Sequence, residues 1–242
     1  MLLEQGFENS HLNAPLLAFV WRCAADGRVT RESLAWSLTH LGTNSIFTRR
    51  SRLHAELHSL ATGNRCPGKP ARIIEEKITT LDMAAGTITT EGGHTYTGDL
   101  IIGADGINSA VRAAILSTNS LAGSVDVAGG AAAVPSGVAA YLCIVPNSVI
   151  RDDPVLAFQT GEKSGMATFH SDDGRKQVLV FPADAENFQI IAYHPEDGWV
   201  EQFTQSGSSI IKDIPAERAV QDFVEFHPSI QKMFASAATR DV

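Results

Sequence analysis

The chain has 242 residues, 44% of them hydrophobic and 19% charged, with a formal net charge of −8. The acidic balance repels phosphate backbones, no apolar run approaches the length of a membrane span, and the first residues lack the pattern of a secretory signal. We therefore expect a cytoplasmic chain of about one to two domains with no nucleic-acid partner and no membrane span, in which the three widely spread cysteines are reduced thiols.

The first predicted elements are a β-hairpin and an amphipathic helix. Residues 16–23 form a strand-like run that ends at Ala25-Asp26-Gly27-Arg28, a sequence typical of a tight hairpin turn. A helix is expected to open near Arg49, Arg50 and Arg52, because the leucines that follow recur at helical spacing. These leucines are Leu53, Leu57 and Leu60. On composition alone, arginines gathered at a helix start indicate a solvated basic face.

Short runs after this helix predict a small β-meander. They are rich in β-branched residues and are separated by turn signals. The runs are residues 71–74, 76–81, 86–91 and 94–97, with a Gly-Gly turn before the last of them. The meander leads directly into the stretch with the clearest functional signal.

Residues 98–112 combine a strand, a glycine-containing turn and a helix start. The apolar run from Leu100 to Ile102 predicts a short buried strand. Gly103 and Gly106 allow the backbone to approach a ligand closely, and Ser109 can cap the helix that follows. Because helix N-termini attract negative charge, this arrangement favours an anionic ligand beside the turn.

This stretch resembles the Asp-Gly motif of the class A flavoprotein monooxygenases, the family of the salicylate and para-hydroxybenzoate hydroxylases. An apolar run is followed by Gly-Ala-Asp-Gly and then by Ser-x-x-Arg. The resemblance implies a place beside the FAD pyrophosphate and an influence on nicotinamide cofactor use. The residues to which it gives cofactor-binding roles are Gly103, Asp105, Gly106 and Arg112. The Asp105 carboxylate is expected to accept from a ribose hydroxyl or an ordered water. The alternative is a strand, turn and helix of any α/β protein.

The predicted helix resembles a second element of the same family, an Arg-x-x-Leu sequence whose arginine reaches the FAD. Arg50 with Leu53 fits this spacing, and Arg49 and Arg52 are its rivals. The element stands before the Asp-Gly stretch and is separated from it by the predicted meander, as in the family. The resemblance therefore adds Arg50 to the expected cofactor-binding residues.

The second half of the chain predicts the antiparallel sheet of a substrate domain. Strand-like runs lie at residues 138–145, 155–159, 166–170, 177–181 and 188–193. The Ala- and Gly-rich residues 113–140 are expected to form a loop before the sheet. Tyr141 is a candidate substrate-facing hydroxyl, and ordinary packing is the alternative for a tyrosine in a sheet.

The chain departs from the family pattern at several places. Where relatives carry an aromatic-Arg pair this chain has Tyr141-Leu142, and where they carry a tyrosine before a proline it has Phe181-Pro182. Since both polar groups help to orient a phenolate, these departures count against ordinary phenolate hydroxylation. The sequence also has no Gly-x-Gly-x-x-Gly turn and no Gly-Asp-Ala-Ala-His element. The resemblance therefore covers the middle of the family's usual chain, and the chain is expected to be truncated at both ends.

The resemblance implies an α/β (α+β) fold, with a partial FAD-binding Rossmann-like domain beside an antiparallel β-sheet substrate domain. Expected boundaries are 1–120 for the FAD-binding part with a substrate-domain hairpin near its start, 121–205 for the sheet, and 206–242 for a helical return towards the FAD domain. The expected activity is FAD-dependent hydroxylation of a small aromatic or polyketide-type molecule with NAD(P)H and O2.

Two alternatives to this activity remain open. The first is a non-catalytic remnant that cannot hold FAD alone, because the elements that contact most of the cofactor are missing. The second is a flavin-dependent halogenase or epoxidase, since one cofactor fold supports several chemistries. No metal site is expected, and no catalytic residue is assigned.

Overall fold

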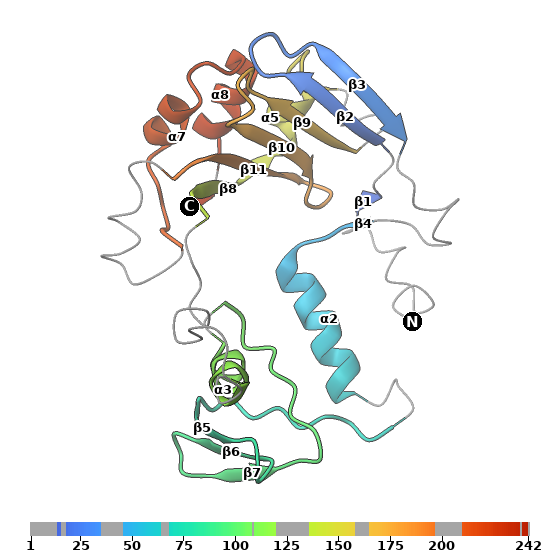
Figure 1. The fold of residues 1–242 in the computed structure, drawn as a ribbon. Helices are drawn as coiled ribbons and strands as arrows, with labels where there is room; N and C mark the ends of the chain where they lie inside the picture. The colour runs from blue at the N-terminus through green and yellow to red at the C-terminus, as the bar shows by residue number, and fades with distance from the viewer. Residues whose placement is uncertain are drawn as a thin grey trace. The chain divides into compact units, whose positions relative to one another are not determined.

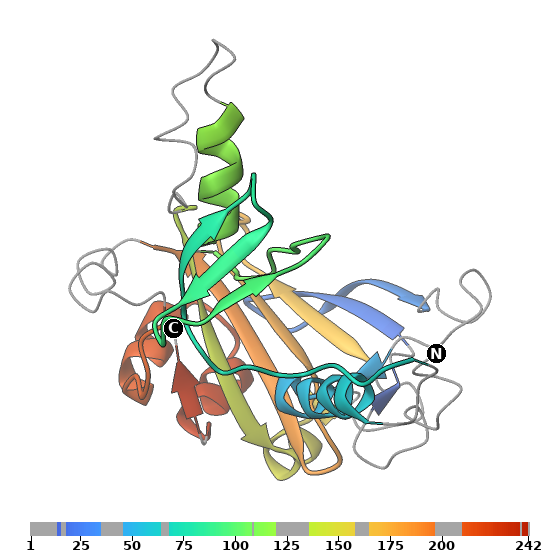
Figure 2. The ribbon, with the colours of Figure 1, turned by 90° about the horizontal axis from the view of Figure 1, so that it is seen from below.

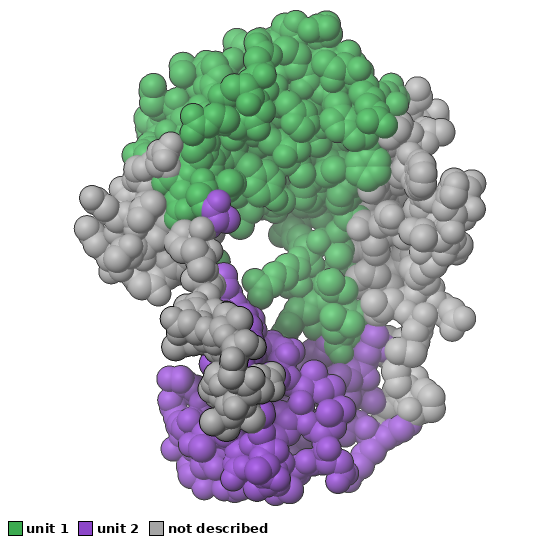
Figure 3. All heavy atoms as spheres, in the orientation of Figure 1, with its two compact units in different colours: residues 1–57, 137–242 green, residues 58–136 purple. Residues whose placement is uncertain are grey.

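The computed structural model describes residues 14–15, 18–34, 46–63, 68–107, 109–119, 136–157, 165–196, 210–237 and 239–241. The chain forms two compact units, which we call unit 1 (residues 1–57 and 137–242) and unit 2 (residues 58–136) (Figure 3). This division differs from the expected boundaries at 120 and 205, because the N-terminal hairpin and the C-terminal helices both belong to the unit that contains the large sheet. Each unit is described by itself.

A seven-stranded sheet forms the centre of unit 1, in the order β12-β8-β11-β10-β9-β2-β3 (Figure 1). Its strands are β2 (Ala18–Cys23), β3 (Val29–Leu34), β8 (Val138–Pro146), β9 (Met166–His170), β10 (Gln177–Pro182), β11 (Asn187–Pro195) and β12 (Thr239–Asp241). Their neighbours are antiparallel except for β2 and β9, which run parallel. The strands lie side by side in the view of Figure 2.

One face of this sheet is buried under helices. Side chains alternate between buried and more exposed along β8, β10 and β11, which is the period of a strand with one covered face. The covering helices are α5 (Asn147–Arg151), α7 (Ala216–Asp222) and α8 (Pro228–Ala235). The largest side chains in this core are Tyr141, Phe169, Phe223, Phe226 and Phe234, all of them almost completely buried. Each such aromatic side chain stabilises the fold by roughly 1.5 to 3 kcal/mol.

Polar contacts fix the helices on the sheet. His227 is the N-cap of α8, where its Nδ1 accepts from the amide of Ser229 at 3.2 Å. The Ser229 hydroxyl donates to Asp153 Oδ1 at 2.8 Å, which ties the start of α8 to the turn after α5. Lys176, just before β10, donates to the carbonyl of Asp222 at 2.5 Å and pairs with Glu225 at 2.7 Å. These bonds hold the segment between α7 and α8 against the end of the sheet.

Unit 2 contains a three-stranded antiparallel sheet and helix α3 (Ala110–Asn119). The strands are β5 (Ile78–Asp82), β6 (Thr87–Thr90) and β7 (Thr95–Thr97), in that order. The predicted meander is therefore confirmed in its last three runs. Residues 71–74 were also expected to form a strand, but they have no strand partner and are exposed.

The remaining elements are two short strands and a helix whose last residues belong to unit 2. Strands β1 (Ala14–Pro15) and β4 (Ile46–Phe47) pair with each other, and helix α2 (Arg50–Thr62) follows. The predicted helix and the predicted hairpin, now β2 and β3, are confirmed. Among the described residues, no helix is both long enough and apolar enough to cross a membrane.

Three other expectations about local structure were wrong. Leu100 to Ile102 do not form a strand, because no described segment offers them backbone partners, and Leu100 and Ile102 are 77% and 79% exposed. Residues 155–157 form a turn instead of a strand, because Asp153 accepts the amides of Val155, Leu156 and Ala157. Residues 113–119 belong to α3 and 138–140 to β8; residues 120–135 of the expected loop lie outside the described residues.

Candidate functional site

The Asp-Gly stretch of unit 2 ends in a side-chain cap on helix α3. The Ser109 hydroxyl donates to Asp105 Oδ1 at 2.6 Å, and the amide of Ala110 donates to Asp105 Oδ2 at 2.6 Å. The amide of Val111 reaches the same oxygen at 3.3 Å, while Ser109 Oγ accepts the amide of Arg112 at 2.9 Å. Ser109 therefore caps α3 as predicted, and Asp105 satisfies the adjacent helix amides.

This cap changes how an anion would meet the helix. The Asp105 carboxylate already occupies the first amides of α3, so the negative charge expected at the helix start comes from the chain itself. The hydrogen bond from Ser109, together with the backbone amides, lowers the pKa of Asp105 from its ordinary value. The carboxylate is thus an ionised, exposed and fixed acceptor, with lone pairs left for a further donor.

Glycine is favoured at positions 103 and 106 for two different structural reasons. A Cβ on Gly103 would lie 2.6 Å from Cβ of Val111, so the absence of a side chain allows the segment to pack against α3. Gly106 has a φ of +77°, which favours glycine, and a Cβ there would meet nothing within 4 Å. Gly103 therefore serves internal packing, whereas the backbone of Gly106 is open to a ligand.

Arg112 braces the turn from the first turn of α3. Its guanidinium donates to the carbonyl of Ile107 at 2.5 Å. Together with the bonds to Asp105, this contact closes the loop between Gly106 and α3. The structure thus brings Gly103, Asp105, Gly106 and Arg112 together in one turn of unit 2, as the sequence pattern predicts.

Arg50 lies in unit 1, in the first turn of α2, and its side chain is exposed. The neighbouring Arg49 forms an ion pair with Asp184 in the β10–β11 turn. Near this pair, the rings of Phe47 and Phe181 stack with centroids 4.8 Å apart. Arg49 therefore anchors the start of α2 to the sheet, and this leaves Arg50 as the better-placed arginine for an external anion than Arg49.

Tyr141 is a core residue of unit 1. Its side chain is fully buried, and its hydroxyl donates to Asp222 Oδ2 at 2.5 Å. Its ring lies 4.9 Å from that of His194 and packs near Phe223 and Phe234. Burial and the Asp222 carboxylate raise the pKa of Tyr141, so the phenol stays protonated. This placement favours the packing interpretation over contact with a substrate.

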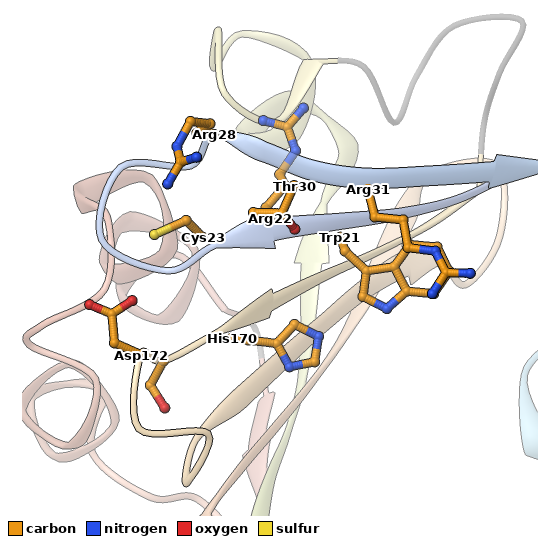
Figure 4. Close-up of a pocket in the computed structure, with 9 residues that line it drawn as sticks. Trp21, Arg22, Cys23, Arg28, Thr30, Arg31, His170 and Asp172 are labelled. Carbon is orange, nitrogen blue, oxygen red and sulfur yellow. The ribbon is translucent and has the colours of Figure 1, made fainter.

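The structure also forms a pocket that the sequence patterns did not indicate. It opens beside the β2–β3 hairpin, with Trp21, Arg31 and His170 among the residues that line it (Figure 4). A cross-strand signal was present, since Trp21 and Arg31 stand at opposite positions around the predicted hairpin turn. The contribution of His170 depends on the pairing of β2 with β9, which no local pattern predicts.

Sequence comparisons find FAD-dependent monooxygenases, while no protein-family model matches the chain. The chain is 27% identical over 148 residues to the FAD-dependent monooxygenase phomE of Diaporthe leptostromiformis, which covers 60% of this chain and 36% of the relative. It is 40% identical over 76 residues to hispidin-3-hydroxylase of Neonothopanus nambi, which covers 31% of this chain and 18% of the relative. The matches thus span well under half of these relatives' length.

Solved structures of flavoprotein hydroxylases share the fold. HpxO of Klebsiella pneumoniae, complexed with FAD and uric acid, aligns with 100% of this chain and 55% of its own, at a TM-score of 0.68 and 18% identity. The structure of 2,6-dihydroxypyridine-3-hydroxylase of Arthrobacter nicotinovorans aligns with 99% of this chain and 58% of its own, at a TM-score of 0.70 and 14% identity. The chain is therefore similar in sequence to part of several FAD-dependent monooxygenases, and it shares the fold of solved structures that include an FAD complex.

Proposed function

We propose that this chain serves a FAD-dependent monooxygenase that uses NAD(P)H and O2 to oxidise a small planar molecule. The single observation that carries the proposal is the Asp105 carboxylate, which is ionised and fixed at the start of α3 next to the open Gly106 backbone. Bound FAD would supply the redox and oxygen-transfer chemistry. The chain's own task is then to hold this cofactor and to position the substrate.

The residues of the Asp-Gly turn fit one part of FAD. Asp105 can accept from a ribose or ribityl hydroxyl through Oδ1, which has a lone-pair direction beyond the one that the Ser109 hydroxyl uses, whereas Oδ2 accepts the amides of Ala110 and Val111. Gly106 permits close approach of the ligand to the backbone, and Arg112 keeps the turn in shape through Ile107. We assign Asp105 and Gly106 to direct contact, and Gly103 and Arg112 to support of the turn.

Arg50 fits the pyrophosphate. The first turn of α2 carries arginines and no acidic residue. Their positive charges are repelled by the positive N-terminal end of the helix dipole. A bound anion offsets this repulsion, and a planar guanidinium can form two parallel bonds to a phosphate. With Arg49 paired to Asp184, Arg50 is the residue that we assign to this role.

The substrate is proposed to meet the sheet face that α5, α7 and α8 do not cover. Along β8, Leu142 lies between the buried side chains of Tyr141 and Cys143, and is 41% exposed on that opposite face. Phe181 of β10 has the same orientation and is half-buried against Phe47. Such a surface suits a planar apolar molecule, and the uric acid bound to the Klebsiella neighbour supports a small planar substrate.

A second candidate function is a non-catalytic chain that cannot retain FAD by itself. The observation in its favour is the exposure of Leu100 and Ile102, which lead into the Asp-Gly turn without strand partners among the described residues. In the cell we place either form in the cytoplasm, where the thiols of Cys23 and Cys143 remain reduced.

The two candidates are separated by a cofactor titration of the purified chain. The chain is mixed with FAD and desalted, and the visible absorption spectrum is recorded. Retained flavin whose amount falls in Asp105→Ala and in Arg50→Ala supports the proposed site. Asp99→Ala is the matched control for Asp105→Ala, because it removes an exposed negative charge that is not part of the α3 cap. Arg72→Ala is the matched control for Arg50→Ala, because it removes an exposed positive charge outside α2. A colourless chain favours the non-catalytic candidate. If the amount of retained flavin is unchanged in both Asp105→Ala and Arg50→Ala, our residue assignment is wrong.

A further inference from the structure

A histidine is buried in the core of unit 1, on the face of the sheet that the helices cover. His194 of β11 is 3% exposed, and its Nδ1 lies 2.7 Å from the backbone carbonyl oxygen of Pro195. Because a carbonyl oxygen only accepts, Nδ1 carries the proton of the neutral ring. A second proton would have to enter at Nε2, and this atom is buried as well. The charged form of His194 therefore has no contact with water in the folded chain.

Aromatic rings enclose this imidazole. The ring of Tyr141 lies 4.9 Å from that of His194, and the ring of Phe223, directly after α7, lies 6.0 Å away and perpendicular to it. Both of these side chains are fully buried. Burial lowers the pKa of His194 from its ordinary value, and the hydrogen bond to Pro195 opposes this shift without reversing it. The core thus accommodates the neutral imidazole and disfavours the cation.

Two cations lie near the imidazole. Gln177 of β10 is paired with Tyr193 of β11, so Lys176 and His194 are the next residues along these two strands. Arg218 of α7 is the second cation. Beyond the effect of burial, both cations lower the pKa of His194 further. A proton on the imidazole would add another positive charge to this end of the sheet.

The nearby carboxylates already have partners. Asp222, at the end of α7, attracts a charged imidazole, but its Oδ2 accepts from the Tyr141 hydroxyl at 2.5 Å and from Arg218 Nε at 3.2 Å. Glu225, in the segment after α7, pairs with Lys176 at 2.7 Å. An imidazolium would therefore have to compete with these donors for a carboxylate.

The same groups attach α7 to the sheet (Figure 1). Lys176 Nζ donates to the backbone carbonyl of Asp222 at 2.5 Å, and Tyr141 donates to the carboxylate of that residue. Ala219 and Phe223 are fully buried in the core. Helix α7 has seven residues, so its stability comes from these contacts, because helices of this length are marginal on their own in water.

We propose that His194 makes the attachment of α7 sensitive to acid: a proton that enters at Nε2 is accommodated when α7 and Phe223 move off the end of the sheet and the imidazolium reaches water. Strands β8 and β11 stay paired in this opened form, since they share nine residue pairs. The inference concerns unit 1 alone, goes beyond the proposed FAD function and does not depend on it.

Linkage gives the direction of the effect. In the closed form the pKa of His194 is lowered, whereas in the opened form the imidazole has the ordinary histidine pKa of about 6.5. The closed form is therefore fully favoured above that pH. Below it, opening takes up a proton, and the opening equilibrium constant rises by up to about tenfold per pH unit until the pH reaches the lowered value.

The test is amide hydrogen exchange of the full 242-residue chain, followed by NMR at pH 7.5, 6.5 and 5.5 and corrected for the intrinsic exchange rate at each pH. Protection of the α7 amides should fall several-fold, and at most about tenfold, between pH 7.5 and 5.5, with most of the loss below 6.5. The amides of β8 and β11 should keep their protection. An equal loss in these strands would indicate unfolding of the whole sheet and would overturn the proposal.

Variants identify the responsible group. His194→Asn keeps an N–H donor for the Pro195 carbonyl but never becomes charged, so its α7 protection should be the same at all three pH values. His227→Gln removes the histidine that caps α8 and should keep the pH response of α7. If His227→Gln abolishes the response, His194 is not its source and the proposal is wrong.

A measurement on the unaltered chain does not depend on how the variants fold. The imidazole signals of His194 are followed by NMR as the pH is lowered, with assignment from the sequential connections to Pro195. Titration below the ordinary value of about 6.5 supports the proposal. Titration at or above that value would overturn it, because acid would then stabilise the closed form. Neither result depends on whether the chain retains FAD.

Discussion

Unit 1 and unit 2 use similar apolar residues in opposite ways. In unit 1, Phe223 and Phe234 are fully buried between the helices and the sheet. In the described part of unit 2, Leu60 and Thr90 are the buried side chains, while Leu100 and Ile102 are mostly exposed. Unit 1 thus has a hydrophobic core of its own, whereas the order of unit 2 depends on local hydrogen bonds and short strand pairing.

The largest effect is expected from a cavity in the core of unit 1. Phe223→Ala removes a ring that packs against Tyr141, Phe226 and Phe234, and should lower the free energy of unfolding by about 3 to 5 kcal/mol. Urea denaturation measures the change. Val224→Ala is the matched control, because that side chain is 57% exposed and its loss should cost less than about 0.5 kcal/mol. Equal costs would mean that unit 1 has no well-packed core.

A smaller effect is expected from the buried hydrogen bond of Tyr141. Tyr141→Phe keeps the ring but leaves Asp222 without its phenol donor, and should lower the free energy of unfolding by about 1 to 3 kcal/mol. The half-exposed Tyr193 gives the control, since Tyr193→Phe should change stability by less than about 0.5 kcal/mol. If Tyr141→Phe leaves the free energy of unfolding unchanged, the tyrosine is not held by Asp222, and contact with a substrate becomes the better interpretation of Tyr141.

In unit 2, the test is the contact between Gly103 and Val111. Gly103→Ala brings a methyl group within 2.6 Å of Val111 Cβ and should cost about 1 to 3 kcal/mol of local stability. Amide hydrogen exchange across α3 reports the loss. Val111→Ala in the same chain should restore part of the protection, because it removes the two methyl groups that lie 2.7 and 3.0 Å from the added Cβ but keeps its own Cβ. If Val111→Ala restores no protection, packing against α3 is not the reason that position 103 requires glycine.

The smallest expected effect is the pH response of the α3 cap. Hydrogen bonds from Ser109 and from helix amides lower the pKa of Asp105 in the folded chain. The cap's contribution is therefore present above the ordinary aspartate pKa of about 3.9 and is lost as the pH falls through the lower folded value. NMR exchange of the Ala110 and Val111 amides should show protection that persists to below that ordinary value. Asp105→Asn should remove this pH dependence, and an unchanged profile would exclude Asp105 as its source.

The sequence predicts those elements whose signal is local. The strand-like apolar runs predict β8, β10 and β11, and the turn at Ala25–Arg28 indicates the β2–β3 hairpin. The Asp-Gly turn was predicted with its Ser109 cap because capping depends on residues a few positions apart. Whether Arg50, Gly103, Asp105, Gly106 and Arg112 bind a cofactor stays a prediction.

Sequence patterns did not predict the features that depend on partners far apart in the chain. Leu100 to Ile102 are apolar enough for a strand, but a strand also needs a neighbour, and hydrophobicity alone does not supply one. The role of Tyr141 is set by Asp222, which comes from a helix near the other end of the chain. His170 lines the same pocket as Trp21 because β2 and β9 pair in parallel. In each case the missing information was long-range contact.

The parallel pairing of β2 with β9 has a consequence for how the chain folds and opens. It joins residues 19–23 to residues 166–170, so the chain must close a very long loop before this contact forms. The β2–β3 hairpin forms quickly from local contacts, but it docks on the sheet late and sits at its edge. It is therefore the part of unit 1 that we expect to detach first, exposing Trp21 and His170 together.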